Sequence, residues 1–317
     1  MPVQIRWTAA GPLVDWCHLG ELRFSDPFFL QTINRAMGHP FNLLFRHSTP
    51  LETLAEPAAF ELRPAGLIFH MTRCGSTLVA RMLASLSGNV VLSEPGPIDQ
   101  LLRLPSRWPN VTIDDHALWL RAMIAALGRR RRADERDLFI KLTGWHILLL
   151  PLFRRAFPDL PWMFLYRDPV EVLTPMAQRF PLEIEPALLD LTWPQVGAMS
   201  CERYCALILE RICRAAIEHC GSEGGLLIEH RELPEAALTR LLQHFGRRCG
   251  AEELARMREV ARFDAKQPER GYVDDSHDKR AGASQEVRDL AATLLAPLYA
   301  QLEALRANQR GWHHSIN

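Results

Sequence analysis

The segment at residues 66–78, GLIFHMTRCGSTL, constrains the fold of this chain more than any other. Residues 67–69 form a short apolar run typical of a strand buried on both faces, and Leu78, Met82 and Leu86 recur at helical spacing directly after the next turn. The turn therefore lies at a helix N-terminus, where free backbone N–H groups and the positive end of the helix dipole attract anions. We expect a strand, a phosphate-binding loop and a helix.

The turn differs from the loop of nucleoside triphosphate-binding proteins, which ends in Gly-Lys-Ser/Thr so that the lysine reaches the outer phosphates and the hydroxyl holds magnesium. Here His70 replaces the first glycine of that pattern and Ser76 replaces the lysine, while the one cation of the turn, Arg73, precedes Gly75. A phosphate-loop kinase of small molecules is therefore a less favoured alternative.

The order of residues in the turn resembles the phosphosulfate loop of the sulfotransferases, which usually reads Lys or Arg, any residue, Gly and then two hydroxyl residues. In that family the loop wraps the 5'-phosphate of the sulfate donor 3'-phosphoadenosine-5'-phosphosulfate (PAPS), and no metal is required. The resemblance implies that six consecutive residues bind the donor: Arg73, Cys74, Gly75, Ser76, Thr77 and Leu78. The alternative is an ordinary helix start, because Gly-Ser-Thr turns also occur there.

The composition restricts the kind of partner. The chain has 317 residues, of which 48% are hydrophobic, enough for a packed core. The 37 basic residues balance the 37 acidic ones, so we expect no general affinity for nucleic acid or for a membrane surface, and any anion site must be local. Only three basic residues are lysines, Lys141, Lys266 and Lys279, an arginine bias typical of a GC-rich genome.

Targeting segments and metal clusters are not expected. The chain starts without a charged segment followed by an apolar core, and no run approaches the roughly 18 apolar residues of a membrane span, so we expect a cytoplasmic protein. Four of the seven cysteines, Cys201, Cys205, Cys213 and Cys220, recur at near-helical offsets in an apolar pattern and are expected in the core. A metal cluster would need tighter spacing with histidine nearby.

Short apolar runs separated by helical stretches predict the strands of one sheet: residues 67–69, 90–92, 138–140, 161–166 and 226–228. This alternation is typical of an α/β protein with a three-layer, doubly wound parallel sheet of about five strands. In the resembled family this is the sulfotransferase fold, which is similar to that of the P-loop NTPases. We expect the domain to cover residues 61–317, including a basic loop at 263–284 and a terminal helix to about Leu305.

The first 60 residues contain many aromatic side chains and no phosphate-loop chemistry. Asp26-Pro27 is typical of a turn or helix start, and Phe28, Phe29 and Ile33 follow it at helical spacing. We expect a helical N-terminal cap that packs on the main domain, with a substrate lid as the alternative.

Charged residues follow three further predicted strands. Glu94, Lys141 and Arg167 come directly after or at the end of the second, third and fourth apolar runs. Because the carboxyl ends of parallel strands meet at one edge of a sheet, we expect these side chains to gather beside the phosphate loop. For Glu94 the alternative is a helix cap, since proline and glycine follow it.

The resemblance extends over about residues 64–235. Lys141 to Arg167 is similar to the family segment that runs from a sulfuryl-contacting lysine, through Leu-Leu-Pro, to the Arg-Asn/Asp-Pro start of the 3'-phosphate site. This similarity implies that Lys141 contacts the sulfuryl group and that Arg167 binds the 3'-phosphate. Lys279 and Arg280 resemble, more loosely, the basic loop that closes over the 3'-phosphate.

Two positions depart from the family pattern. The family usually places a serine eight residues after the arginine, where this chain has Pro175, so either Thr174 substitutes for it or the 3'-phosphate is held differently. Cytosolic members carry a basic histidine two residues after the lysine, where this chain has Thr143.

Carbohydrate and tyrosyl members use a glutamate followed by proline instead, and Ser93-Glu94-Pro95 fits that version. We therefore predict Glu94 as the general base, with a pKa raised by partial burial, because an unperturbed carboxylate is a weak base for an alcohol. His146 is the reserve candidate, and its alternative role is that of a helix-start residue.

By analogy with phosphoryl transfer, sulfuryl transfer passes in line through a loose, SO3-like transition state, and the protein mainly positions the reactants and neutralises the leaving group. Arg73 and Lys141 would supply that neutralisation. The sequence thus predicts a PAPS-dependent sulfotransferase acting on a small-molecule or peptidyl hydroxyl or amine. A P-loop small-molecule kinase and a non-catalytic nucleotide-binding relative are the alternatives, and the oligomeric state stays open.

Overall fold

The computed structural model describes residues 1–317 except 10, 56–61, 182–183, 223 and 315–317. Its centre is a five-stranded sheet in the order β5-β6-β4-β7-β8, in which every neighbouring pair is parallel. The strands are β4 (Pro64–His70), β5 (Asn89–Ser93), β6 (Asp137–Lys141), β7 (Trp162–Tyr166) and β8 (Leu226–Glu229). All five predicted strands are confirmed, and the strand that precedes the phosphate loop lies in the middle.

The strands form because their side chains are apolar on both faces. All five residues of β7 are buried, as are six of the seven in β4. Phe69 of β4 lies edge-on to Trp162 of β7 and to Phe153 behind it, with ring centroids 5.9 and 5.5 Å apart. Burial of both faces requires helices on both sides of the sheet.

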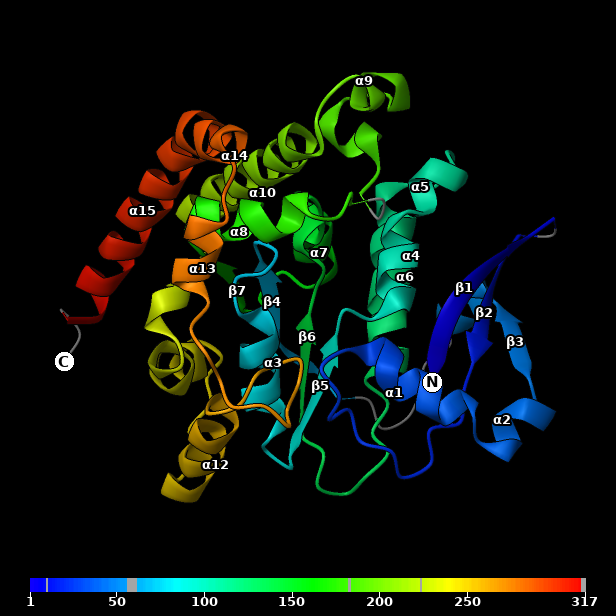
Figure 1. Ribbon diagram of the computed structural model, residues 1–317. Coiled ribbons are helices and arrows are strands. Elements are labelled where there is room, and N and C mark those ends of the chain that lie inside the picture. Colours follow the sequence, from blue (N-terminus) through cyan, green and yellow to red (C-terminus); the bar gives the residue numbers. More distant parts are fainter. Residues whose placement is uncertain (10, 56–61, 182–183, 223, 315–317) are drawn as a thin grey trace.

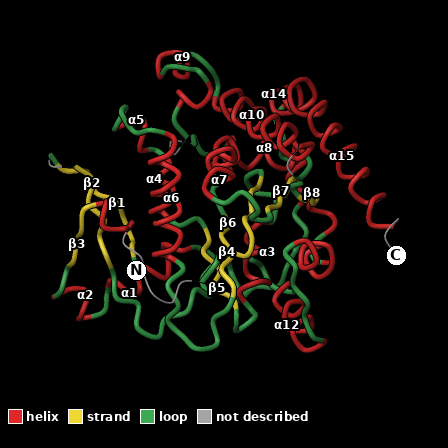
Figure 2. The backbone as a smooth tube through the Cα atoms, turned by 180° about the vertical axis from the view of Figure 1, so that it is seen from behind, coloured by secondary structure: helices red, strands yellow, loops and turns green. Residues whose placement is uncertain are grey.

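The connections supply these helices. The chain crosses from β4 to β5 in one direction along the sheet, and from β5 to β6, β6 to β7 and β7 to β8 in the other. Because such crossovers are right-handed, α3 lies on one face and α6, α7 and α10 lie on the opposite face. The packing agrees, since α3 contacts α12, whereas α6 packs on α7 and α10 on α8 (Figures 1 and 2). The predicted three-layer α/β fold is confirmed.

The helices between the strands are α3 (Ser76–Ala84), α4 (Gly96–Leu102), α5 (Leu104–Arg107), α6 (Ile113–Leu127), α7 (Leu150–Ala156), α8 (Pro169–Ala177), α9 (Trp193–Gly197) and α10 (Cys201–Ser222). Of the four cysteines predicted in the core, Cys205, Cys213 and Cys220 lie there, whereas Cys201 is only partly buried and packs against it.

The N-terminal region is not a helical cap, and this prediction was wrong. It forms a three-stranded antiparallel sheet of β1 (Pro2–Thr8), β2 (Gly11–Trp16) and β3 (His47–Pro50), together with α1 (Phe29–Met37) and α2 (Pro40–Leu44). The reason is a period-two pattern, in which Ile5 and Val14 are buried between more exposed neighbours. The helix expected after Asp26-Pro27 is present as α1.

The N-terminal sheet packs on α4 and α6 of the main body. The backbone N–H of Ile5 donates a 2.6 Å hydrogen bond to the side chain of Gln100 in α4. The predicted boundary between residues 60 and 61 lies outside the described residues.

The C-terminal region follows β8 with α11 (Leu242–His244), α12 (Ala251–Ala261), α13 (Ser276–Ala281), α14 (Gln285–Leu290) and α15 (Ala296–His314). The predicted loop at 263–284 therefore contains a short helix, α13, and the last helix extends beyond Leu305. The loop before α13 passes α3 in Figure 1. Arg81 of α3 donates a hydrogen bond of 3.2 Å to the carbonyl of Asp264 in this loop. None of the helices among the described residues combines the length and the apolar character that crossing a membrane requires.

Candidate active site

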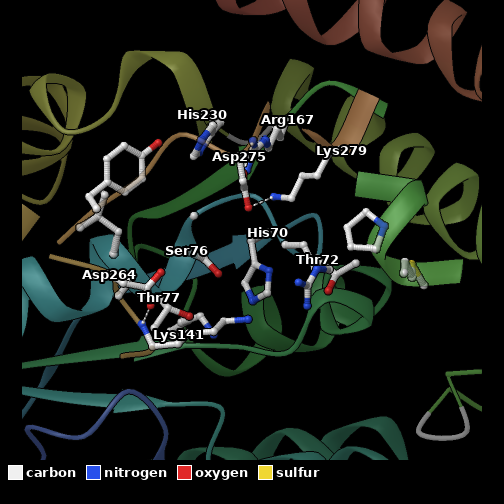
Figure 3. A pocket seen from close by; sticks show the side chains of 18 of the residues that line it. His70, Thr72, Ser76, Thr77, Lys141, Arg167, His230, Asp264, Asp275 and Lys279 are labelled. Carbon is white, nitrogen blue, oxygen red and sulfur yellow. Dashed lines mark hydrogen bonds and ion pairs between the residues drawn. The ribbon is translucent and has the colours of Figure 1, made fainter. Parts of the chain in front are cut away.

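A cavity of about 510 Å³ opens at the carboxyl edge of the central sheet, between the phosphate loop and the loop that follows α12. Nine of the predicted site residues line it: Arg73, Gly75, Ser76, Thr77, Leu78, Glu94, Lys141, Arg167 and Lys279. In Figure 3, Arg167 and Lys279 gather at one side and Lys141 lies at the other, with Ser76 between them. Cys74, His146, Thr174 and Arg280 are not among the described residues that line it.

The phosphate loop has the geometry of an anion-binding turn. Gly75 precedes the first residue of α3 with φ of 94°, and a Cβ atom there would lie 2.8 Å from Nδ1 of His230, so both the backbone angle and the space favour glycine. Cys74 is fully buried and its thiol donates to the carbonyl of Leu165. Burial raises the pKa of this thiol to about 12, so the thiol is protonated at neutral pH and does not act as a nucleophile.

Glu94 and Lys141 form an ion pair on the floor of the cavity. Lys141 is almost fully buried, and its carbonyl accepts a 2.7 Å hydrogen bond from the backbone N–H of Glu94, which aligns the two strand ends. Burial by itself raises the pKa of the Glu94 carboxyl, but the charge of Lys141, followed by that of the His70 ring when it is protonated, outweighs burial and holds the pKa below its usual value. The prediction that burial raises this pKa was therefore wrong.

His70 is a site residue that the sequence analysis noted only as a replacement for glycine. It ends β4, is buried, and its Nε2 lies 3.8 Å from Oε1 of Glu94. Burial first, and then the charge of Lys141, lower the pKa of His70 to about 4, so the ring is neutral at pH 7. One feature of the sequence could have revealed it, because a polar residue at the end of an otherwise apolar buried strand needs a reason to be there.

Arg167 leaves β7 at the other side of the cavity. Its side chain is 5% exposed and donates to Glu171 at 2.6 Å, and to Asp275 and Ser276 at 3.0 Å each. The Asp275 carboxylate also pairs with Lys279 at 2.8 Å, so one carboxylate joins the two cations that were predicted to bind a phosphate (Figure 3). Asp275 and Ser276 were missed, because nothing in the local sequence relates them to a strand end more than 100 residues earlier.

Two residues predicted near the 3'-phosphate are engaged elsewhere. The hydroxyl of Thr174 donates to the carbonyl of Val170 at 2.8 Å within α8. Of Thr174 and its neighbour Pro175, it is Pro175 that lines the cavity. Arg280 pairs with Glu171 at 2.7 Å and with Asp168 at 3.3 Å. The substitution of Thr174 for the family's serine therefore has no geometric support.

His146 takes the helix-start role that was its alternative. Its Nδ1 accepts a hydrogen bond of 3.2 Å from the backbone N–H of Thr143, and its Nε2 donates to Asp99 at 3.0 Å. Because both ring nitrogens have partners and the side chain is 1% exposed, His146 does not reach the cavity.

The N-terminal region and the loop after α12 each add a side chain to the cavity. Phe28, which precedes α1, lies between two cations, with its ring centre 5.4 Å from Nζ of Lys141 and 5.9 Å from Nζ of Lys266. Burial, followed by the charges of Arg73 and Lys141, lowers the pKa of Lys266. The charges of Lys266, Arg73 and Lys141 are therefore close enough to act on one another at the cavity.

Comparisons with known proteins give remote similarities. No family model and no curated protein matches the sequence. Several sulfotransferases are among the solved structures that resemble this one. A sulfotransferase from Alicyclobacillus acidocaldarius is 15% identical with a TM-score of 0.45, over 77% of this chain and 96% of that one.

A sulfotransferase domain from the curacin biosynthetic pathway is 14% identical with a TM-score of 0.44, over 79% and 98% of the two chains. A mouse sulfotransferase complexed with PAP is 13% identical with a TM-score of 0.36, over 80% and 86%.

Proposed function

We propose that this chain is a sulfotransferase that moves the sulfuryl group of PAPS to a hydroxyl or amine of a small-molecule or peptidyl acceptor. The observation that carries the proposal is the convergence of Arg73, Lys141 and Arg167 on one cavity beside a helix N-terminus, with the carboxylate of Glu94 among them. A donor with phosphate groups at two ends needs such separated cations, and an acceptor that loses a proton needs a base between them.

The cavity suits the donor at both of its anionic ends. At one end are the N-terminal N–H groups of α3 and the fork of Arg73, which we assign to the 5'-phosphosulfate. At the other end Arg167 and Lys279 already hold a carboxylate, Asp275, and we assign them to the 3'-phosphate. When bound, the donor would supply an activated sulfuryl group.

The residues of the chain then have separate tasks. Lys141 would stabilise the charge that develops on the oxygen of the leaving phosphate, because it is buried and a buried cation acts in a low dielectric. We assign to Glu94 the acceptance of the proton. Since Lys141 lowers the pKa of Glu94, a donor anion that attracts Lys141 would also make Glu94 a stronger base.

The decisive experiment incubates the purified protein with PAPS and a set of alcohols, phenols, sugars, amines and tyrosyl peptides. Mass spectrometry should find adenosine 3',5'-bisphosphate and one sulfated acceptor in equal amounts. Thermal-shift measurements with the bisphosphate, and with ATP in the presence and absence of magnesium, separate the alternatives. A kinase would be stabilised by ATP with magnesium, and a non-catalytic binder by the bisphosphate without any product.

A further inference from the structure

His70 is a buried polar side chain of which one ring nitrogen is left without a hydrogen-bond partner among the described residues. It ends the apolar strand β4, its side chain is 5% exposed, and it extends toward the side of the cavity where Lys141 lies (Figure 3). Its Nε2 is buried and has no hydrogen-bond partner among the residues that the structure describes. An unsatisfied buried polar atom costs about 1 to 3 kcal/mol, so its presence needs an explanation.

The hydrogen bond of the other ring nitrogen determines the tautomer. Nδ1 lies 3.2 Å from the carbonyl oxygen of Met71, and a carbonyl only accepts, so we assign the proton of the neutral ring to Nδ1. With that assignment Nε2 carries the lone pair, and this nitrogen lies 3.8 Å from Oε1 of Glu94. Two acceptors that face each other repel unless a proton lies between them.

We infer that His70 and Glu94 form one proton-accepting pair, in which the proton released by the acceptor is shared between Oε1 of Glu94 and Nε2 of His70. The inference rests on the proposed function. As the acceptor oxygen bonds to sulfur, its O–H bond breaks and the proton passes to Glu94, while the sulfur–oxygen bond to the 5'-phosphate breaks and leaves adenosine 3',5'-bisphosphate. Protonated Glu94 then donates to Nε2, which makes the carboxylate a stronger base because the hydrogen bond stabilises its neutral form.

Charged groups from several elements surround this pair. Glu94 follows β5, Lys141 ends β6, and Lys266 approaches from the loop after α12. The charge of Lys141 lowers the pKa of His70, whereas the charge of Glu94 raises it. His146, which lies beyond the cavity, lowers the pKa of Glu94 less than Lys141 does. Any anion that attracts Lys141 therefore raises the proton affinity of both members of the pair.

Two substitutions separate the two ring nitrogens. Asparagine at position 70 retains a donor near Nδ1 but has no atom at Nε2, whereas glutamine places an amide oxygen near Nε2 that accepts a hydrogen bond but cannot take a proton. We expect His70→Asn to lower kcat about 10- to 100-fold with an unchanged KM for PAPS, and His70→Gln to recover part of the loss. His116→Gln, at another buried histidine outside the cavity, is the matched control.

The pH profile shows whether His70 acts through Glu94 or only through the fold. Without an acceptor for its proton the pKa of Glu94 falls, so the acid limb of the kcat profile should move to lower pH in His70→Asn. A drop in kcat with an unmoved acid limb would mean a structural role, and a normal kcat would mean no role. Either result overturns the inference.

Histidine ¹H–¹⁵N NMR of the free protein tests the pair without turnover. In the wild type, His70 should be neutral at pH 7 with its proton on Nδ1, and Glu94→Gln should lower its titration midpoint because the attraction between imidazolium and carboxylate is removed. A proton on Nε2 at pH 7, or an unchanged midpoint, overturns the inference. If these results hold while no acceptor is sulfated, the proposed function is wrong, whereas the interaction between His70 and Glu94 is still supported.

Discussion

Two of the residues proposed to take part in the chemistry have an unusual backbone conformation. Arg73 and Glu94 have φ of 54° and 55°, values that non-glycine residues seldom adopt and that cost about 1 to 3 kcal/mol each. Neither residue is glycine or asparagine, so local preference does not explain the conformation. With this backbone Glu94 pairs with Lys141, and Arg73 lines the same cavity.

At this scale Arg73→Ala is the first prediction. Arg73 is the cation within the phosphate loop, and its planar fork can hold two oxygens of the phosphosulfate. We expect kcat/KM for PAPS to fall by the equivalent of about 2 to 4 kcal/mol, as for single donors in other oxyanion sites. Arg258→Ala, an exposed arginine in α12, is the matched control. Undiminished turnover in Arg73→Ala would remove the loop from the mechanism.

The second prediction concerns Glu94→Gln, which keeps the size and hydrogen bonding of the side chain but not its basicity. We expect kcat to fall about 10²- to 10⁴-fold, with little change in the affinity for adenosine 3',5'-bisphosphate, and the acid limb of the pH profile to disappear. Steady-state kinetics and calorimetry measure the two quantities. Near-normal turnover here, combined with its loss in His146→Ala, would instead make His146 the base in spite of its burial.

At the level of elements, the loop before the short helix α13 supplies the carboxylate that pairs with the cations near the end of β7. Asp274 and Asp275 precede this helix, and only Asp275 reaches the cavity, where it pairs with Arg167 and Lys279. Burial raises the pKa of the Asp275 carboxyl, but Lys279 and Arg167 outweigh it, so the group is ionised at neutral pH. It therefore competes with any phosphate for the same two cations.

The third prediction follows from this competition. Asp275→Asn should bind adenosine 3',5'-bisphosphate about 3- to 10-fold more tightly, because partly exposed ion pairs are worth about 1 kcal/mol or less, and should bind an analogue without the 3'-phosphate as the wild type does. Arg167→Ala should weaken the binding of the bisphosphate alone, and Asp278→Asn, at an exposed carboxylate of α13, should change the binding of neither ligand. Equal changes for both ligands in Asp275→Asn or Arg167→Ala would show that the 3'-phosphate does not bind at this end.

At the level of the whole molecule, the order of the strands brings the site together. β4 is central, and the chain leaves it for one edge of the sheet before returning past it to the other. The connections on the two sides of β4 therefore diverge, and such points in open parallel sheets leave a crevice at the carboxyl edge. The cavity lies at this edge, and the N-terminal region and the loop after α12 close it with Phe28 and Lys266.

The fourth prediction concerns the pH dependence of global stability. Burial raises the pKa of Asp99 in α4, but hydrogen bonds from His146 and Arg103 outweigh burial and lower the pKa from 3.8 to about 2. The stabilisation from a lowered pKa is complete above the unfolded value and is lost as the pH falls from about 4 toward 2.

Asp99→Asn should therefore cost about 2 kcal/mol in the free energy of unfolding at pH 7, and the difference from the wild type should shrink below about pH 4. Urea unfolding at several pH values measures it, with Asp114→Asn as an exposed control. A difference that does not depend on pH would assign the effect to packing.

The sequence by itself determined the five strands, the phosphate loop and the edge of the sheet at which charged residues meet. These features are local, because apolar runs, glycine and a helix start depend on residues within a few positions of each other. From the sequence the N-terminal region was wrongly predicted as a helical cap. The pairing of β2 with β3 joins segments more than 30 residues apart, and the aromatic composition of the region does not reveal this pairing.

Only the tertiary structure decided how the site residues are paired. Burial and neighbouring charges shift a pKa in opposite directions, so the sign for Glu94 depended on the position of Lys141, which lies 47 residues later in the chain. Tertiary contacts likewise decided three other features of the site. These are the unpartnered nitrogen of His70, the position of the Asp275 carboxylate between two cations, and the hydrogen bonds that keep His146 and Thr174 out of the cavity. Each is a contact between side chains distant in sequence or a choice between competing hydrogen bonds, and residue types alone specify neither.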